Sequence, residues 1–297
     1  MANFVIYTFE FGKLRNTREP ELFPDETNVE ENFSNKQEIL SRILEDERDL
    51  GFSYEDENLN YLQVLHYLNL VILRIANHKI KKGELNFSEV EFDSYPSSMV
   101  IIDNRKDIQH IAIQKRTEAF KNTDVLANII KDTLNRHLYS YGLTIDINHK
   151  TFVSGFWNIA ERLNYQIDKM EINFPPVNLP RITNLIKGIA NQSEMLNGRA
   201  KTSFEAANKT NLVLEKSNPF LEQILEACSD AGYDVLLRSS VSKTVYSIRD
   251  ETPAVTEYMS DELLLRIQAY KKGSEDMFNT LFELLVEWVN NIQTVYF

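Results

Sequence analysis

The chain has 297 residues, 43% of them hydrophobic and 26% charged, and Cys228 is its single cysteine. This composition is typical of a globular protein with one large or two ordinary domains, and one cysteine excludes a disulfide framework and a cysteine-based zinc cluster. The sequence has no positively charged leader and no run of about 18 apolar residues, so we expect a cytoplasmic protein without a membrane span.

Charge is distributed unevenly along the chain, whose net charge is −12. Residues 1–60 carry 15 acidic and 6 basic side chains, whereas residues 105–150 carry 5 acidic and 8 basic ones. The acidity of the whole argues against promiscuous nucleic-acid binding, because phosphate contacts require Lys and Arg. A local basic face remains compatible with it. The alternative interpretation is that the negative charge only keeps the protein in solution.

The first hundred residues are predicted to be mostly strand with an acidic interruption. Residues 3–11 are β-branched and aromatic and indicate an opening strand. Residues 16–36 contain two prolines and many acids, which favours a loop or an insertion. A short helix at 36–47, with Asn35 and Glu38 as a capping box, is expected before a solvated acidic stretch at 46–60. Residues 61–92 alternate mostly as strands, although leucine spacing leaves a helix at 61–73 open.

The middle of the chain contains the clearest hairpin and helix signals. The apolar run Met99–Asp103 is followed by a polar turn and by Ile108–Gln114, which predicts a hairpin. Thr123 then opens a helix with an apolar stripe to Leu138, and Gly142 ends it. The elements expected next are a strand at 143–148, a helix at 152–163 and a strand at 169–174.

The last third is predicted to be mainly helical. Its expected elements are a helix and loop at 181–211, a helix at 219–232, two strands at 233–237 and 244–248, and helices at 261–272 and 275–292. We therefore predict an α+β fold with a mixed or antiparallel sheet, flanking helices and a helical C-terminal end. Residues 1–175 form an α+β domain with an acidic insertion near 16–60. Residues 176–297 form a mostly helical part, with a short hairpin near 233–248, that packs on it.

Catalytic and cofactor motifs are absent from the sequence. GxGxxG, Walker, GxSxG, HExxH and CxxC patterns do not occur, and the five histidines are scattered, so we expect no cofactor and no metal. A metal-dependent nuclease would need a carboxylate on the strand after Asp103, where the triplet is Ile113-Gln114-Lys115. We favour a turn at Asp103 and assign no catalytic residue. A divergent nuclease or hydrolase using Asp103, Glu118 and Asp124 is left as an alternative.

Two groups of residues are candidates for binding. The first is a basic patch at the hairpin tip and after its second strand, which could hold phosphates if it converges: Arg105, Lys106, Lys115, Arg116 and Lys121. Its alternative is a solvated rim paired with acids. The second group is the wide apolar face of the last helix: Phe282, Leu285, Trp288, Val289 and Ile292. That face is either a core face or a homo-oligomer interface, where such side chains are enriched.

Several short segments together carry a resemblance to a known family. They are Pro96–Val100, Ile108–Ile113, Ala119–Asp124 with the helix to Leu138, and Ile267–Met277. In these segments the chain resembles the RexA family of phage exclusion proteins and related prokaryotic and phage proteins. The resemblance implies a dimer that contacts DNA, works with a partner in phage exclusion or defence, and has no recognised catalytic residues. The chain departs from the family in its acidic residues 1–60.

Three functions are therefore considered. The first is a non-enzymatic binding protein in the conflict between phages and bacteria, which assembles as a homo-oligomer through its C-terminal part. It would bind DNA or a protein partner through the region from Arg105 to Lys121. The second is the divergent nuclease or hydrolase. The third is a phage-encoded inhibitor of a host defence complex, whose acidic surface mimics nucleic acid or blocks a basic site.

Overall fold

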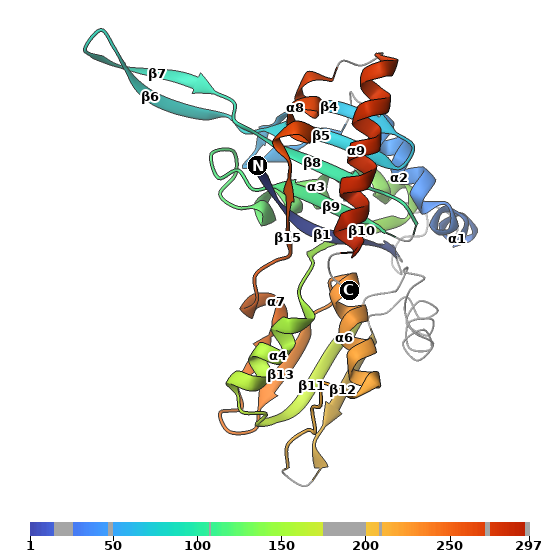
Figure 1. Ribbon diagram of the computed structural model, residues 1–297. Coiled ribbons are helices and arrows are strands. Elements are labelled where there is room, and N and C mark those ends of the chain that lie inside the picture. The colour runs from blue at the N-terminus through green and yellow to red at the C-terminus, as the bar shows by residue number, and fades with distance from the viewer. Residues whose placement is uncertain are drawn as a thin grey trace.

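The computed structural model describes residues 1–14, 26–46, 50–106, 108–174, 200–207, 210–270 and 274–294. Two sheets with separate hydrophobic cores dominate this part of the chain, and a long hairpin projects from the larger one (Figure 1). Every strand pair in both sheets is antiparallel. Helices pack on the faces of both sheets. The fold class is α+β with a helical C-terminal end, which confirms the prediction.

The larger sheet is built around the N-terminal strand. Its strands are β1 (Ala2–Lys13), β4 (Asn60–Tyr67), β5 (Leu70–Ala76), β8 (Ser97–Asp103), β9 (His110–Gln114), β10 (Leu143–His149) and β15 (Thr256–Met259). They are ordered β10-β1-β9-β8-β5-β4. Along the edge of β1 opposite β9, its first half pairs with β15 and its second half with β10. The chain therefore returns from its far end to complete the sheet.

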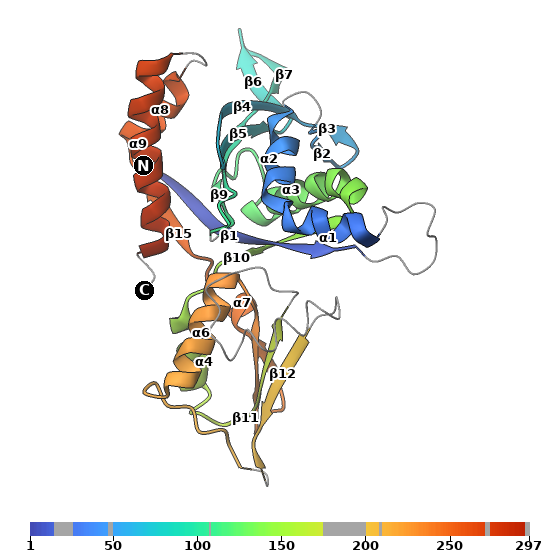
Figure 2. The ribbon, with the colours of Figure 1, turned by 90° about the vertical axis from the view of Figure 1, so that its right-hand side faces the viewer.

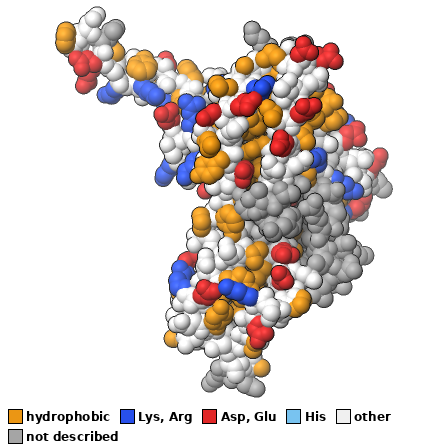
Figure 3. Space-filling view, viewed as in Figure 1, with side chains coloured by type: hydrophobic (Ala, Val, Ile, Leu, Met, Phe, Trp, Pro, Cys, Tyr) orange, Lys and Arg blue, Asp and Glu red, His pale blue; other side chains and the backbone are white. Residues whose placement is uncertain are grey.

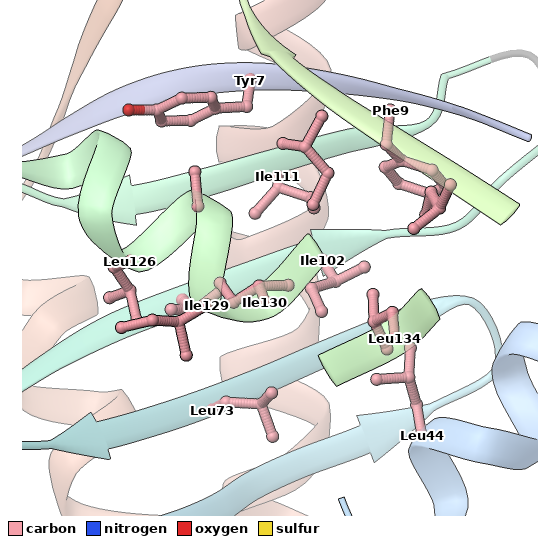
Figure 4. Close-up of a cluster of buried hydrophobic side chains, with 14 of the residues drawn as sticks. Tyr7, Phe9, Leu44, Leu73, Ile102, Ile111, Leu126, Ile129, Ile130 and Leu134 are labelled. Carbon is pink, nitrogen blue, oxygen red and sulfur yellow. The ribbon is translucent and has the colours of Figure 1, made fainter. Parts of the chain in front are cut away.

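Side chains of β1 alternate between two cores because a strand places successive residues on opposite faces. Tyr7, Phe9 and Phe11 face one core, and Phe4 and Ile6 face the other. The first core is covered by α1 (Glu26–Ser34), α2 (Lys36–Glu45) and α3 (Thr123–Leu138). The second is covered by α8 (Asp261–Ala269) and α9 (Glu275–Thr294). Figure 2 shows the sheet between these helices, and Figure 4 shows the first core.

The position of α3 matters most for the site described below. It begins at Asn122, whose Oδ1 accepts a hydrogen bond of 2.9 Å from the Val125 amide, as an N-cap does. Its buried stripe includes Leu126, Ile130 and Leu134, which pack against the sheet. A 3₁₀ turn follows, and Gly142, with φ of 68°, ends it in the left-handed conformation. The predicted helix therefore forms with its predicted boundaries, and its first turn lies beside β1.

A smaller four-stranded sheet lies next to the first. It has the order β12-β11-β13-β14, made by Ala200–Glu205, Ile167–Phe174, Val235–Ser239 and Val245–Ser247. Three helices pack on its apolar face: α4 (Val153–Arg162), α6 (Pro219–Ala231) and α7 (Ile248–Glu251). This sheet draws strands from both sides of the predicted boundary near residue 175.

Two further hairpins lie within the part of the chain that forms the larger sheet, one before β4 and one between β5 and β8. Strands β2 (Ser53–Tyr54) and β3 (Glu57–Asn58) form a short pair whose neighbours Phe52 and Leu59 are buried in the first core. Strands β6 (Lys79–Leu85) and β7 (Ser88–Ser94) form the projecting hairpin. Within the described chain, no helix is long and apolar enough to cross a lipid bilayer.

Several local predictions were wrong. Residues 26–34, expected to be a loop, form α1. The Asn35 side chain makes no capping hydrogen bond to α2, so the predicted capping box does not form. The stretch 46–60 holds a hairpin and buried residues, and the alternative helix at 61–73 is excluded by β4 and β5. Strands β12 and β15 were missed. Predictions for 16–25, 181–199 and 271–272 lie outside the described residues.

Candidate functional site

A pocket of about 270 Å³ lies at the first turn of α3, beside β1, β9 and β10. Three of the five predicted basic residues, Lys115, Arg116 and Lys121, contribute to its lining. They come from the segment that joins β9 to α3. The loop between β9 and α3 therefore folds around this pocket.

Buried side chains and backbone hydrogen bonds hold this segment in place. The Lys115 amide donates to the carbonyl of Asn3 at 2.8 Å, which continues the pairing of β9 with β1. The amides of Ala119 and Phe120 both donate to the carbonyl of Arg116, at 3.0 and 3.2 Å. Because Ala119 and Phe120 are buried in the first core, the turn between them and Arg116 is fixed to the sheet. Its basic side chains are thereby directed to the exposed rim.

The rim carries positive charge that the described chain does not neutralise fully. Arg116 donates from Nη1 to the carbonyl of Ser97 at 3.0 Å, and its Nη2 lies 3.5 Å from the Glu118 carboxylate. Lys115 and Lys121 are exposed, and neither has an ion-pair partner among the described residues. An exposed ammonium without an internal partner remains available to an anion from outside.

The first turn of α3 adds to this positive potential. The helix has 16 residues, and Asn122, at its N-cap, and Thr123 both line the pocket. Amides at a helix N-terminus lack internal acceptors, and the helix dipole makes this end positive. Asp124, the acidic residue of the first turn, partly offsets that charge.

The inner wall of the pocket is a hydrogen-bonded group at Tyr7. Its hydroxyl oxygen lies 2.8 Å from Thr123 Oγ1 and 2.8 Å from Asp124 Oδ1. Burial raises the pKa of Tyr7, so the phenol keeps its single proton and donates it to the carboxylate. Burial, and then the charge of Arg249, lower the pKa of His149, while Asp124 opposes the shift. At neutral pH the wall therefore presents an uncharged imidazole.

This arrangement is suited to binding and lacks a nucleophile beside a base. His149 Nδ1 lies 4.0 Å from Asp124 Oδ1, which is too long for a hydrogen bond. Tyr7 is locked as a donor to Asp124, and its raised pKa opposes formation of a phenolate. The three cations at the rim, beside the uncharged side chains of Tyr7 and His149 and against the single carboxylate of Asp124, form a receptor for an anionic group such as phosphate.

The other two predicted basic residues lie elsewhere. Arg105 binds Asp103 through Nε and Nη2, at 3.0 and 2.7 Å, and also donates to Asn290 of α9. Lys106 is exposed beside it. The five residues of β9, which span about 17 Å at about 3.4 Å per residue, run between Lys106 and Lys115. The predicted single patch is therefore divided, because Arg105 and Lys106 precede β9 and the other three residues follow it.

The carboxylates of the alternative nuclease also fail to converge. Asp103 is buried with Arg105 on the α9 face of the sheet, whereas Asp124 contacts Tyr7 on the α3 face. Glu118 is largely exposed and paired with Arg116. In the part of the chain that the structure describes, His, Cys, Asp and Glu form no group of three that could hold a metal. Cys228 is buried in the core of the smaller sheet, and burial raises the pKa of its thiol.

The apolar residues assigned to the last helix pack inside their own chain. Leu285, Trp288, Val289 and Ile292 are buried against the larger sheet, and Phe282 is partly buried beside them. Trp288 lies edge-on to Phe4 of β1, at 5.2 Å between ring centroids, and its Nε1 donates to the carbonyl of Tyr258. Leu285, Trp288, Val289 and Ile292 therefore belong to the core, as one of the two interpretations expected. Of the five residues, Phe282 is the one whose ring also contacts the exposed ring of Tyr67.

Comparison of the sequence with family models and with curated proteins finds no match. The assignment of the site therefore depends on its geometry. Tyr7 and His149 were not selected from the sequence, because a tyrosine inside a strand and a histidine at a strand end are ordinary. Only the pairing of β1 with β10, which sets Tyr7 opposite His149, brings them together.

Proposed function

We propose that this is a non-enzymatic binding protein that holds DNA phosphates at the pocket of Lys115, Arg116 and Lys121, and that acts in the conflict between phages and bacteria. The observation that supports phosphate binding most directly is the convergence of these three cations at the N-terminus of α3. The biological setting comes from the sequence resemblance to phage exclusion proteins. We also infer that the chain assembles as a homo-oligomer.

The charge distribution supports a small contact area with DNA. The chain as a whole carries a net charge of −12, so most of its surface repels a polyanion. The pocket rim concentrates three cations within one seven-residue segment, 115–121. Binding would then use few phosphates, and its dependence on salt would be modest compared with that of a highly basic protein.

The size of the pocket supports recognition of a backbone phosphate over a large cofactor. Sites for drug-sized ligands occupy roughly 300–1,000 Å³, and this pocket has about 270 Å³. A phosphate with part of its sugar fits such a volume, while the rest of a duplex stays outside. Contacts to phosphate and sugar carry no direct sequence information, so we expect little sequence preference.

The experiment is a fluorescence-anisotropy titration of a short labelled DNA duplex at low salt. The triple variant K115Q/R116Q/K121Q removes the pocket cations, and K106Q/K201Q/K216Q removes three exposed cations elsewhere, so both change net charge equally. We expect the pocket variant to bind at least tenfold more weakly than wild type and the control variant to bind within about twofold. Equal affinities of the two variants would contradict the proposal.

A further inference from the structure

The hairpin formed by β6 and β7, residues 79–94, is called the arm below. Among the described residues its two strands pair only with each other, from Lys79 opposite Ser94 to Leu85 opposite Ser88. It projects well beyond the larger sheet (Figure 1). Hydrophobic side chains lie along it (Figure 3). Isolated two-stranded hairpins are only marginally stable in water, so an arm of this length normally needs support.

The base of the arm is fixed to the body. The ring of His78 stacks on Tyr95, with 5.2 Å between centroids, and His78 Nε2 lies 2.7 Å from Asp93 Oδ1. The backbone N–H of Asn77 donates to the carbonyl of Pro96 at 3.0 Å, and its side-chain Nδ2 donates to the carbonyl of Ala119 at 2.9 Å. These contacts set the direction in which the arm leaves the sheet.

At the tip of the arm, an exposed aromatic residue adopts an unfavourable backbone conformation. Asn86 and Phe87 have φ of 52° and 63°, as in the two-residue turns that favour Asn-Gly. A phenylalanine in this left-handed conformation costs conformational energy that glycine would avoid. Phe87 is 98% exposed, so its side chain contributes almost no packing within the chain. A strained, exposed aromatic residue therefore points to a contact outside this chain.

The charges of the arm favour a protein as that contact. Its strands carry three lysines and four acids: Lys79, Lys81, Lys82, Glu84, Glu89, Glu91 and Asp93. One opposed pair, Lys82 and Glu91, already forms an ion pair of 3.3 Å. A nearly neutral arm with slight negative excess gains little from phosphates or from an anionic lipid surface. Its exposed Ile80, Phe87 and Phe92 offer apolar area instead.

The same chain contains a recess that suits an aromatic side chain. It has about 280 Å³ and is lined chiefly by β4 residues, including Val64 and Tyr67, together with Tyr270 and Phe278. The Tyr67 ring lies 4.7 Å from that of Phe278 and 4.9 Å from that of Phe282, in edge-on geometry. Aromatic groups favour such edge-on partners. Leu68, which follows Tyr67 in the chain, is 69% exposed and has φ of 52°.

The arm cannot fill the recess of its own chain. Strands β4 and β5 pair from Asn60 opposite Ala76 to Tyr67 opposite Leu70. The arm leaves the sheet after Ala76, whereas the recess lies at Tyr67, at the other end of these strands. The arm also points away from α9, which carries Phe278 (Figure 1). An apolar knob and a matching recess at opposite ends of one molecule can meet when two copies associate.

We propose that Phe87 at the tip of the arm of one copy docks into the recess of Tyr67 and Phe278 on a second copy. The occupant of the recess is thus another molecule of this chain. If the exchange is reciprocal, two such contacts form a closed dimer. The contact uses neither Lys115 nor Lys121. A test of this contact is therefore independent of any test of DNA binding.

The first test is the molar mass of the full chain by light scattering across a concentration series, for wild type, F87G and V213S. Phe87→Gly removes the knob and suits the turn, so it should unfold at the same temperature as wild type or higher. Val213→Ser is the control, because Val213 is 78% exposed elsewhere. We expect wild type and V213S to dimerise and the dimer dissociation constant of F87G to rise at least tenfold.

The second test identifies the site that the arm contacts. The photoreactive benzoylphenylalanine, placed at position 87, should cross-link two chains, and mass spectrometry should locate the bond in residues 63–67, 270 or 278. A wild type that stays monomeric, an F87G variant that dimerises as wild type does, or a cross-link confined to other residues would each overturn the proposal.

Discussion

The hydroxyl of Tyr7 lies 2.8 Å from the carboxylate of Asp124, so the central strand of the larger sheet is tied directly to the first turn of α3. Tyr7 is buried, and Asp124 is largely exposed at the pocket rim. This contact fixes the helix N-terminus beside the loop of Lys115 and Lys121. It also places one negative charge where the proposed ligand is negative.

Replacing that charge should therefore strengthen DNA binding. In Asp124→Asn, the amide oxygen can still accept from Tyr7, but the repulsion of phosphate is lost. We expect affinity to rise about fivefold, or about 1 kcal/mol, while the free energy of unfolding falls by less than about 1 kcal/mol from the lost helix-dipole interaction. Asp132→Asn, on the same helix two turns further along, is the matched control. Weaker binding by the Asp124 variant would count against an anion at this pocket.

The pair of Asp103 and Arg105 should matter for stability and not for binding. Asp103 is 2% exposed and Arg105 33% exposed, and they share a two-pronged contact. Arg105→Gln leaves a buried carboxylate without its cation. In a fully buried pair this lowers the free energy of unfolding by several kcal/mol. Here we expect a loss of about 2 kcal/mol, because the arginine is partly solvated. Urea unfolding should show this loss, and Asp103→Asn in the same chain should restore most of it. Unchanged stability of the single variant would show that the pair contributes little.

Glu10 should make the stability depend on pH. It is 4% exposed, and burial, together with the nearby Asp146 carboxylate, raises its pKa from 4.5 to about 8, while the Tyr233 hydroxyl opposes the shift. Between these two pH values the unfolded chain loses a proton that the folded chain keeps. The free energy of unfolding therefore falls as pH rises, by at most about 1.4 kcal/mol per pH unit.

The measurement is urea unfolding at several pH values between 5 and 8 for wild type, Glu10→Gln and, as a control, the exposed Glu84→Gln. The Glu10 variant should show a flatter dependence and exceed wild type in stability at the upper end. Parallel curves for wild type and Glu10→Gln would mean that Glu10 keeps a normal pKa.

Gly232 should be required where the smaller sheet meets the larger one. It ends α6 with φ of +67°, and a Cβ there would lie 2.6 Å from Thr8 Oγ1 of β1. Gly232→Ala therefore combines backbone strain with a steric clash, and we expect a loss of about 2 kcal/mol in the free energy of unfolding. The double variant with Thr8→Ala should recover the part caused by the clash. A single variant as stable as wild type would indicate that the two sheets are not packed closely at this point.

The sequence predicted elements well where their signals are local. The helix at 123–138 carries its own cap and apolar stripe, and α9 its wide apolar face, so both formed as expected. The four-residue strand β15 has no such signal, because it exists only through pairing with β1. The helix α1 was missed because two prolines and many acids nearby suggested a loop.

The candidate site was predictable only in part, for geometric reasons. Proximity in the sequence suggested that all five basic residues converge, but an intervening strand keeps Arg105 and Lys106 away from the other three. An apolar helix face also does not specify its partner, so the periodicity of α9 could not distinguish its own sheet from a second copy. Tyr7 and His149 reach the pocket through strand register, which no short motif encodes.

The most direct measurement is the salt dependence of DNA binding by wild type and by K115Q/R116Q/K121Q. A plot of log affinity against log salt has a slope of about −0.9 for each phosphate neutralised. If the three cations bind phosphates, the slope of the triple variant should be shallower than that of wild type by about 2–3. Equal slopes, or a wild-type affinity that salt does not change, would contradict the assignment of this pocket to DNA.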